Sequence, residues 1–439
     1  MRTADCDVTV MGGGLAGLAA CIHLANAGLQ VVCVEPEARG RQPVGESLDW
    51  SSPGLLEGLG FSLEDLIASG ASTYKRGVTL QLADGSGRKY MPRPFLGRPP
   101  FHVELRTLHV DRVRLDQDLE KRALDLGVNL VRDQVTRVES EGERIMVAET
   151  ALGRRLTSPW YIDASGSHAS LLARHFHLPV ESYGLFKVAF WTYFEAPLSQ
   201  EGTTVYVRAE NNAYLDWIWE IPITPTAVSV GYIVSGEAVK QMRQQGLGSE
   251  EIFTMQLNRF SRFEALLRNG SRCPLRTTSF QCRTFKNVSG PNWIIVGEAA
   301  SMVDPITSNG VTSALRHAAE ASALIVEARG ERELPAGART LYNSRVLYMG
   351  TFFNSGIEKF IYARPVRDRI GIRKAATAYV GAAWSINALY SRFRPRGPLK
   401  TWAFGVFLDV LKLAASIFSR MCSVLGHPAH RRPGAPAES

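Results

Sequence analysis

The chain has 439 residues, 45% of them hydrophobic and 21% charged, which is ordinary for a globular protein with a large core. Its length indicates two or three substructures rather than one simple layer sandwich. The formal net charge of +8 comes from residues 361–439, which contain 13 Lys and Arg but only 3 Asp and Glu. A positive charge confined to one segment argues against a nucleic-acid-binding protein and for a single basic face.

The cysteines and the N-terminus bear on the location of the protein. Six cysteines are scattered without CxxC or Cys/His spacing, so we expect neither a metal site nor a disulfide framework. A reducing cytoplasm fits this cysteine usage best. Because a strand pattern begins within a few residues of the N-terminus, we expect no signal peptide.

A strand, a glycine-rich turn and a helix follow one another at the N-terminus. Residues 6–11 predict a buried strand and residues 18–27 predict a helix. The turn between them fits the pattern G-x-G-x-x-G, with glycines at Gly12, Gly14 and Gly17. Such glycines permit a tight turn and let the backbone approach a pyrophosphate at the helix N-terminus. A second strand over residues 30–34 ends in Glu35, where a carboxylate would bind a ribose hydroxyl, so the segment predicts an FAD- or NAD-binding α/β fold.

Short strands dominate the middle of the chain. They are predicted over residues 78–82 and near 186–194, 203–208, 214–221 and 226–234. Residues 217–222 read Trp-Ile-Trp-Glu-Ile-Pro, which puts Trp217 and Trp219 on one face of a strand. Pro222 then ends the strand or confines it to a sheet edge. The pair is either part of a well-packed core or a wall of indole rings beside a site.

A third region carries a flavin-like signature. Residues 293–300 predict a strand ending in Gly297 and Glu298, and a helix is expected to begin near Gly310. This resembles the second flavin signature of FAD-dependent hydroxylases, halogenases and related reductases, with Glu298 where Asp is more usual. Residues 161–166 and 109–116 are similar to further segments of that superfamily, and the second implies that Arg112 lies near the flavin. No second dinucleotide fingerprint is visible, so we expect no built-in NADPH domain.

Three motifs sharpen the resemblance to flavin-dependent halogenases. Residues 44–48 match the Gly-Glu-Ser loop of that family beside the flavin, and residues 217–222 match its W-x-W-x-I-P motif. Lys75 lies just before a strand, where the family has a lysine. Reductases of isoprenoid chains have a similar tryptophan motif, but with Tyr first and Phe before the proline. The cofactor-binding set that these patterns imply is Gly12, Gly14, Gly17, Glu35, Glu46, Ser47, Arg112, Gly297, Glu298 and Asp304.

The resemblance implies a reaction. A separate flavin reductase supplies reduced FAD, which reacts with O2 to form a flavin hydroperoxide. Chloride or bromide attacks this hydroperoxide and gives hypohalous acid. Lys75 then places an electrophilic halogen against the substrate. Either its ammonium donates a hydrogen bond to the hypohalous acid, or its free amine forms a haloamine. Lysine can take either form because its pKa shifts readily on burial. The partition between flavin and substrate would consist of Trp217, Trp219, Ile221 and Pro222. On position alone, Lys75 could equally be a solvated surface lysine.

The segment before the helix near Gly310 implies an anion site. Backbone N–H groups point outward at a helix start, and the resemblance implies that the amides of Asn309 and Gly310 hold the halide. Ser308 matches the serine of the family, but Thr307 stands where tryptophan halogenases have a catalytic glutamate. This departure argues against free tryptophan and for a phenol- or pyrrole-type substrate, either free or bound to a carrier protein. The same residues would also serve as a plain helix cap.

These patterns predict an α/β protein of the FAD-dependent hydroxylase type, with a Rossmann-like FAD-binding domain. Its predicted parts are an FAD-binding domain at 1–74, 100–180 and 280–330, a substrate-side β-sheet domain at 75–99 and 181–279, a helical region at 331–426 and a disordered tail at 427–439. A flavin monooxygenase, a reductase of prenyl double bonds and a flavin-binding protein without turnover remain as alternatives to the halogenase.

The C-terminal region predicts two further helices. Residues 375–391 are free of charge and rich in alanine, which favours a buried helix. Residues 402–425 have apolar residues at helical spacing and predict an amphipathic helix rather than a membrane span. That helix either packs on the body of the protein, docks an acidic carrier protein or binds an anionic membrane surface. The cations that suit the last two partners are Arg392, Arg394, Arg396 and Lys400.

Overall fold

A parallel five-stranded sheet forms the nucleotide-binding half of the molecule, in the strand order β17-β11-β1-β2-β7. The computed structural model describes residues 5–36, 43–92, 94–99, 106–197, 201–208, 214–269, 272–393 and 397–424. The strands of this sheet are β1 (Val8–Met11), β2 (Val31–Val34), β7 (Asn129–Val131), β11 (Trp160–Asp163) and β17 (Trp293–Ile295). The predicted strands at the N-terminus and near residue 293 are therefore confirmed.

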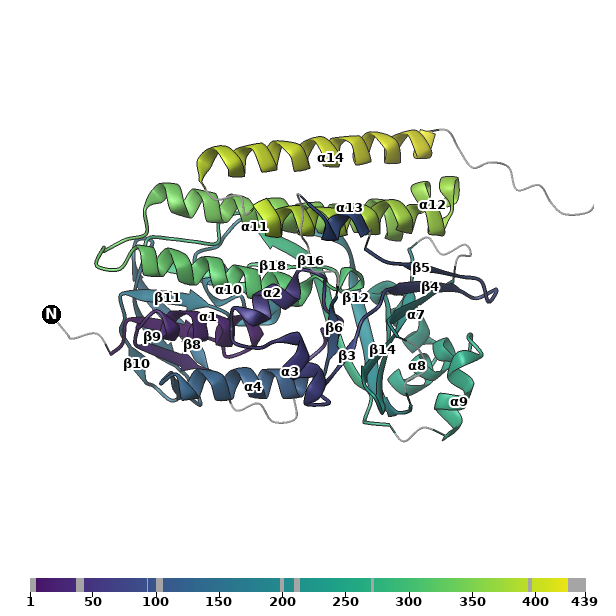
Figure 1. Cartoon of the computed structure of the whole chain (residues 1–439), viewed down its shortest axis with the longest axis horizontal. Coiled ribbons are helices and arrows are strands. Elements are labelled where there is room, and N and C mark those ends of the chain that lie inside the picture. Colours follow the sequence, from purple (N-terminus) through teal and green to yellow (C-terminus); the bar gives the residue numbers. More distant parts are fainter. Residues whose placement is uncertain are drawn as a thin grey trace, which may run out of the picture.

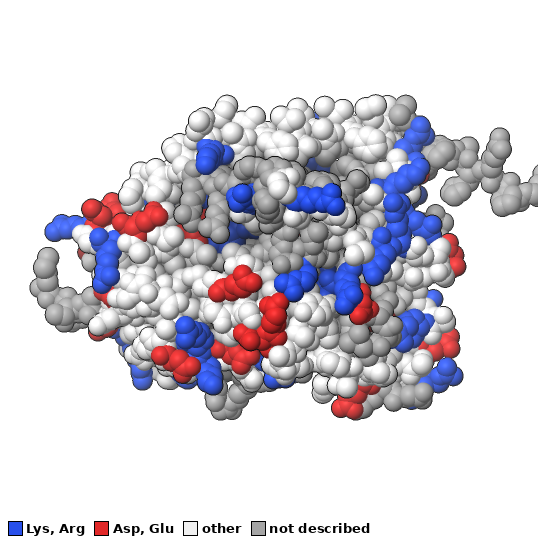
Figure 2. Space-filling view, viewed as in Figure 1, with Lys and Arg blue, Asp and Glu red and all other residues white. Residues whose placement is uncertain are grey.

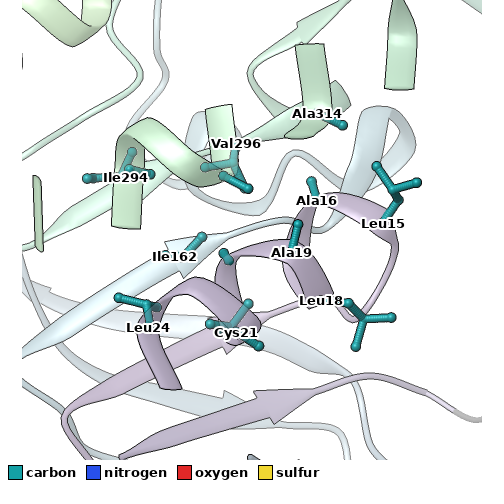
Figure 3. Close-up of a cluster of buried hydrophobic side chains, with 14 of the residues drawn as sticks. Leu15, Ala16, Leu18, Ala19, Cys21, Leu24, Ile162, Ile294, Val296 and Ala314 are labelled. Atoms are coloured by element: carbon teal, nitrogen blue, oxygen red, sulfur yellow. The ribbon is translucent and has the colours of Figure 1, made fainter. Parts of the chain in front are cut away.

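Two helices cover one face of this sheet. Helix α1 (Leu15–Asn26) begins three residues before the predicted helix, and α10 (Gly310–Glu327) begins where it was expected. Figure 3 shows the small side chains Ala16 and Ala19 of α1 within the cluster that also contains Ala314 of α10. Small residues let these helices approach closely and bury the strands beneath them. The helices of this half that do not belong to this pair are α2 (Ser52–Glu57), α3 (Leu63–Ala68), α4 (Arg112–Asp125), α5 (Gly166–Ala169) and α6 (Leu171–His175).

An eight-stranded sheet forms the second half, in the order β18-β16-β12-β15-β14-β13-β4-β5. Its strands are β4 (Val78–Leu82), β5 (Gly87–Tyr90), β12 (Val180–Glu195), β13 (Thr203–Val207), β14 (Trp217–Thr224), β15 (Ala227–Ser235), β16 (Arg276–Phe285) and β18 (Ser301–Met302). Smaller sheets contain β3 (Ser72–Tyr74) with β6 (Leu108–Val110), and β8 (Val135–Glu141), β9 (Arg144–Thr150) and β10 (Arg155–Leu156). In this sheet, β13 lies between the tryptophan strand β14 and β4, and β4 begins three residues after Lys75.

The prediction for Pro222 is wrong in one respect. β14 neither ends at Pro222 nor lies at the sheet edge, but runs on to Thr224 between β13 and β15. Its pairing with β13 stops at Glu220, so Pro222 faces no β13 residue and its missing N–H costs no ladder hydrogen bond. The free carbonyl of Pro222 instead accepts a hydrogen bond from Thr73 of β3.

Helices cover both faces of the eight-stranded sheet (Figure 1). On one face lie α7 (Gly236–Gln244), α8 (Ser249–Leu257) and α9 (Arg262–Asn269), whose apolar residues pack on Ile218 and Val230. The strand-only interpretation of residues 181–279 missed these three helices. The opposite face carries Trp217 and Trp219 and packs against Phe353 and Tyr379 of the C-terminal helices.

The C-terminal region is helical, as expected. It contains α11 (Ala336–Ile357), a π-helical turn (Glu358–Tyr362), α12 (Arg364–Ile370), α13 (Ile372–Phe393) and α14 (Pro398–Val424). The predicted helix at 375–391 lies within α13 and buries Ala375, Ala383 and Ile386. Helix α14 lies at the top of Figure 1 against α11 and α12. The tail predicted at 427–439, and Arg394 and Arg396, lie outside the described residues.

Candidate active site

The glycine turn has the shape that a dinucleotide needs. A Cβ atom on Gly12, whose φ is +108°, would lie 2.4 Å from the carbonyl oxygen of Ala164, and one on Gly17 would lie 1.9 Å from that of Gly12. A Cβ on Gly14, at the N-cap of α1, would meet nothing within 4 Å. Two glycines therefore permit the tight turn, while the third leaves open space at the helix N-terminus, where a pyrophosphate fits. Glu35 accepts a hydrogen bond of 2.6 Å from the amide of Gly13 beside this opening.

The second flavin signature lies at the carboxyl end of β17. Gly297 has a φ of +62°, and a Cβ there would lie 2.7 Å from Cβ of Ala16, so this turn requires glycine. The next residue, Glu298, is exposed and accepts a hydrogen bond of 3.2 Å from Ser167. An exposed carboxylate at a strand end next to α1 fits a contact with a ribose or ribityl hydroxyl. This contact of Glu298 stays a prediction.

The Gly-Glu-Ser loop points its glutamate into the sheet. Oε1 of the buried Glu46 accepts hydrogen bonds from the hydroxyls of Tyr193 (2.9 Å) and Ser229 (3.1 Å), and Oε2 accepts one from the amide of Gly45. Arg112 secures the same loop through a hydrogen bond of 2.9 Å to the carbonyl of Val44. Both side chains stabilise the loop through these hydrogen bonds. Direct contacts of Glu46 and Arg112 with a cofactor stay predictions.

Asp304 belongs to a buried ionic cluster that the sequence did not reveal. The ammonium of Lys187, which is fully buried, lies 3.2 Å from Oδ2 of Asp304 and 2.9 Å from Oε1 of Glu358. Burial alone would lower the pKa of Lys187, but the two carboxylates and Cys282 raise it overall, so the lysine is charged. Asp304 also caps the following turn through the amide of Ile306. The cluster thus fixes the start of the segment that leads to Ser308, and a cofactor contact by Asp304 stays a prediction.

A chain of hydroxyl groups joins two of the predicted residues. Ser308 Oγ donates a hydrogen bond of 3.1 Å to Ser47 Oγ, although the two residues are 261 positions apart. Ser47 Oγ lies 2.8 Å from Thr203 Oγ1, which in turn lies 3.0 Å from Nε2 of His109. His109 is buried, and burial lowers its pKa well below the ordinary value, so the ring is neutral. The predicted loop and the predicted catalytic serine are therefore one hydrogen-bonded unit.

The predicted halide segment combines a helix start with an unsatisfied donor. Asn309 is the N-cap residue of the 18-residue helix α10, and a Cβ on Gly310 would meet nothing within 4 Å. Nδ2 of Asn309 is buried and has no hydrogen-bond partner among the described residues. A buried N–H donor without an acceptor is costly, and a helix N-terminus favours an anion. This site therefore fits a halide.

The hydroxyl of Thr307 is engaged within its own turn. Its hydroxyl donates a hydrogen bond of 2.9 Å to the carbonyl of Asp304 and so closes its own turn. The following residue, Ser308, has a φ of +55°, which is uncommon for a residue other than glycine. Both residues line the cavity that contains Lys75, and a catalytic role of either stays a prediction.

Lys75 is buried and lies in an apolar cavity. Its ammonium donates a hydrogen bond of 2.7 Å to the carbonyl of Leu48 and lies 4.6 Å from the centroid of the Trp50 ring. The side chain is only 2% exposed, and burial lowers its pKa to about 7. The negative charge of Asp49 raises this pKa, but by less than burial lowers it. The interpretation of Lys75 as a solvated surface residue is therefore wrong.

One cavity of about 60 Å³ brings Lys75, Thr307 and Ser308 together. Its other walls are hydrophobic or tyrosine side chains from β4, β5, β13 and the helices α11 and α13, and they include Val205, Tyr379 and Trp384. Lys75 is the one charged residue among the described residues of this lining. The predicted lysine and the predicted Thr-Ser pair, more than 200 positions apart, thus face the same apolar space.

The pKa of Lys75 has a measurable consequence for stability. The unfolded lysine titrates near 10.4, so between about pH 7 and pH 10 the unfolded chain binds a proton that the folded chain does not. We therefore expect the free energy of unfolding of the wild type, relative to Lys75→Met, to rise with pH over this window by up to about 1.4 kcal/mol per unit. Urea unfolding of both proteins at several pH values measures this, and parallel stability curves would contradict the shifted pKa.

The two tryptophans have separate hydrogen-bond partners. Their rings lie 5.8 Å apart, on the same face of β14, as predicted. Nε1 of Trp217 donates to the hydroxyl of Tyr362 (2.9 Å), and Nε1 of Trp219 donates to Ser229 (3.0 Å). Tyr362 in turn donates to Asp304, and Ser229 donates to Glu46. The pair therefore connects the halide segment with the Gly-Glu-Ser loop, and both rings are fixed in orientation.

A glycine opposite Trp219 makes room for its ring. A Cβ on Gly231 would lie 2.1 Å from the indole of Trp219. We expect Gly231→Ala to lower the free energy of unfolding by about 1–3 kcal/mol, because the ring must shift within a packed sheet. Gly337→Ala is the matched control, since a Cβ there meets nothing within 4 Å and the residue lies in α11. Urea unfolding compares the two, and equal stabilities would show that Trp219 is not held in this position.

Comparison with known proteins identifies the family. Residues 102–354, more than half of the chain, match the family model described as tryptophan halogenase. The chain belongs to the tryptophan halogenase family. Residues 7–60 of this halogenase match the model of an FAD-binding domain. The predictions of the family, of an FAD-dependent enzyme and of FAD, halide and O2 as its cofactor and reactants are thus confirmed.

Relatives and solved structures agree with this assignment. The halogenase is 27% identical over 374 residues to the 1H-pyrrole-2-carbonyl-(peptidyl-carrier protein) chlorinase of Pseudomonas fluorescens, covering 79% of this chain and 81% of the relative. It is 26% identical over 353 residues to the tryptophan 2-halogenase of Chondromyces crocatus, covering 79% and 65%. The fold is similar to that of the flavin-dependent brominase Bmp2, with a TM-score of 0.74, 20% identity and coverage of 95% and 99%. The predicted fold class is confirmed.

Proposed function

We propose that this halogenase transfers chlorine or bromine through Lys75 to a neutral, electron-rich aromatic substrate of the phenol or pyrrole type. The observation that carries the proposal is the shared apolar cavity of Lys75, Thr307 and Ser308. Bound reduced FAD would supply two electrons that bring O2 to the oxidation level of a peroxide, which then accepts two electrons from the halide. The remaining steps belong to side chains of this chain.

Lys75 is suited to pass on an electrophilic halogen. With a pKa of about 7, a large share of its side chain is a free amine near neutral pH, and a free amine has a lone pair for the halogen. The protonated share donates a hydrogen bond to hypohalous acid instead. In both forms, the carbonyl of Leu48 and the ring of Trp50 hold the nitrogen in one place. That fixed position decides which carbon of the substrate meets the halogen.

The cofactor side of the site would keep the halide and the flavin apart from the substrate. The amides of Asn309 and Gly310, together with Nδ2 of Asn309, would hold the halide at the start of α10. Gly12, Gly14 and Gly17 would hold the pyrophosphate, and Glu35 and Glu298 would hold ribose or ribityl hydroxyls. Trp217 and Trp219, fixed by their hydrogen bonds, would complete the partition, with Ile221 and Pro222 continuing the strand.

The cavity limits the class of substrate. It offers no Asp, Glu or Arg to a charged amino acid among its described lining residues, and Thr307 lacks the carboxylate that would act as a base. A phenol or pyrrole, being electron-rich, needs less help from such a base. At about 60 Å³ the cavity is smaller than the roughly 150 Å³ that holds benzene, so lining side chains must move when a substrate binds.

Two partners belong to this proposal. A separate flavin reductase would supply reduced FAD, since no second dinucleotide fingerprint is visible in the sequence. The substrate would be presented either free or on a carrier protein. The carrier-bound form is supported by the names of two relatives, the P. fluorescens chlorinase and the brominase of Pseudoalteromonas luteoviolacea, which act on a carrier-bound pyrrole.

A competition assay tests the substrate class. The enzyme, reduced FAD, O2 and bromide are incubated with equal amounts of a neutral alkyl phenol, free tyrosine and free tryptophan. We expect brominated phenol to exceed the brominated amino acids by about tenfold or more, because the apolar cavity cannot pair their charges. Equal bromination of all three would show that the cavity does not select the substrate.

A further inference from the structure

Helix α14 exposes most of its large apolar side chains. Of the 18 exposed large hydrophobic residues among the described residues, ten lie on this one helix. We name them the outer face: Leu399, Trp402, Val406, Phe407, Val410, Leu413, Ile417, Phe418, Met421 and Val424. Their spacing of three and four places them along one side of the helix. The exposed fractions of Trp402, Val410 and Leu413 are 63%, 59% and 62%.

The opposite side of α14, which packs on the body, combines apolar residues such as the fully buried Leu408 with small and polar residues. A Cβ on Gly405 would lie 2.3 Å from the ring of Tyr348 in α11. Ser416 accepts a hydrogen bond of 2.7 Å from Lys359. Near the other end, Cys422 packs with Val366 of α12. The helix is thus held along its length by this side, while the ten residues of the outer face stay exposed.

An outward apolar face of this extent indicates a binding surface. Monomeric proteins rarely expose a large contiguous apolar patch without a partner. α14 is also the one helix, within the described part of the chain, that is long and apolar enough to cross a membrane by length and composition, with 17% of its most apolar window buried. Its contacts with α11 and α12 at Gly405 and Cys422 favour a helix that lies flat on the body over one that leaves it to span.

The charges around α14 identify the kind of surface. Figure 2 shows α14 as an almost uncharged ridge, with Lys and Arg gathered on the flank beneath it. The described residues of 361–424 include five exposed cations, which are Arg369, Lys374, Arg392, Lys400 and Arg420. The acidic residues of the same stretch are Asp368 and Asp409, each within 3.0 Å of a cation. Apolar residues flanked by cations are the pattern of a helix at an anionic membrane surface.

We propose that the outer face of α14 docks this protein on a membrane surface that contains anionic lipid, with the helix lying in the plane of the interface. A second copy of the chain fits less well, since a symmetric contact through α14 would bring two basic rims together. The contact of Tyr390 in α13 with Phe404 in α14 places a wall of the cavity next to the docked helix. An apolar substrate could then reach the cavity from the lipid side, a consequence that rests on the proposed function.

Vesicle co-sedimentation of the full-length protein tests this inference without any halogenation assay. The vesicles are phosphatidylcholine alone, or with about one third phosphatidylglycerol to supply anionic charge. The test variant is Val410→Gln/Leu413→Gln/Ile417→Gln. The matched control is Met91→Gln/Leu152→Gln/Leu185→Gln, which changes three equally exposed apolar residues elsewhere. Circular dichroism and FAD binding confirm that both variants fold.

The wild type and the control should sediment with the anionic vesicles and should dissociate at high salt. The test variant should lose at least about tenfold in partitioning, because three apolar side chains no longer enter the interface. Binding of the test variant equal to that of the wild type overturns the inference, as does a wild type that ignores anionic vesicles. A wild-type dimer that the test variant dissociates would assign the face to a second copy, and a loss of carrier-protein binding without vesicle binding would assign it to a carrier.

Discussion

Lys75→Met should lower halogen transfer by about a thousandfold or more, while reduced FAD in the variant is still oxidised by O2. Lys75 is the one amine among the described residues that line the apolar cavity, so no neighbour can take over the halogen. Methionine has a similar length and suits a site that is 2% exposed, so the fold should tolerate it. Product formation by mass spectrometry and flavin oxidation by absorbance are measured in the same samples.

Two further variants make this result specific. Lys89→Met, on the neighbouring strand β5, changes an exposed lysine and should halogenate like the wild type. Lys75→Arg keeps a hydrogen-bond donor but cannot become a free amine, because arginine stays protonated. If the free amine transfers the halogen, Lys75→Arg is as inactive as Lys75→Met, whereas partial activity assigns transfer to a hydrogen bond from the cation. Full activity of Lys75→Met would contradict any role of this lysine.

Lys187→Met should destabilise the protein by about 3–5 kcal/mol, the largest stability effect that we expect from a single substitution. The lysine compensates two carboxylates, and without it Asp304 and Glu358 face each other in a buried site. The pKa of Glu358 is already raised by burial, so its carboxyl group would take up a proton in the variant. Urea unfolding near neutral pH gives the difference in free energy.

An exposed ion pair provides the comparison for Lys187. Lys286 lies 3.2 Å from Glu181, and both side chains are more than a third exposed. Because water screens such a pair, Lys286→Met should cost less than about 1 kcal/mol. If Lys187→Met costs as little as Lys286→Met, the buried cluster does not hold the segment at Asp304 in the way that the structure shows.

The sequence predicted the parts of the site that depend on local backbone shape. Gly12, Gly14 and Gly17 were recognisable because a tight turn before a helix tolerates few other residues. Trp217 and Trp219 were assigned to one face of a strand because side chains alternate along a strand. The helix starting at Gly310 followed from the same kind of local pattern.

The parts that were missed depend on pairs distant in the chain. Lys187, Asp304 and Glu358 come from a strand, a turn and a π-helical segment, and no local spacing announces their contact. One signal was present, since Lys187 is a lysine inside a long, largely apolar strand pattern. The chain Ser308–Ser47–Thr203–His109 was hidden for the same reason, although two of its members had been predicted separately.

The orientation of α14 was also beyond the sequence. Its apolar residues at helical spacing predicted an amphipathic helix correctly. Helical spacing does not say which side packs on the body, and the usual expectation places the apolar side inward. Here Gly405 allows the backbone to approach Tyr348, and Leu408 is buried on the same side, so the outer face remains exposed. Such close contacts become visible only in three dimensions.

Mass spectrometry of the substrate after a single incubation tests the central claim most directly. The full-length enzyme is given reduced FAD, O2, bromide and a set of neutral phenols and pyrroles, free and carrier-bound, beside the same incubation with Lys75→Met. Transfer through Lys75 predicts the isotope pair of one bromine on a product of the wild type and no such pair with the variant. A product that carries an added oxygen in place of bromine, formed equally by both proteins, would contradict it.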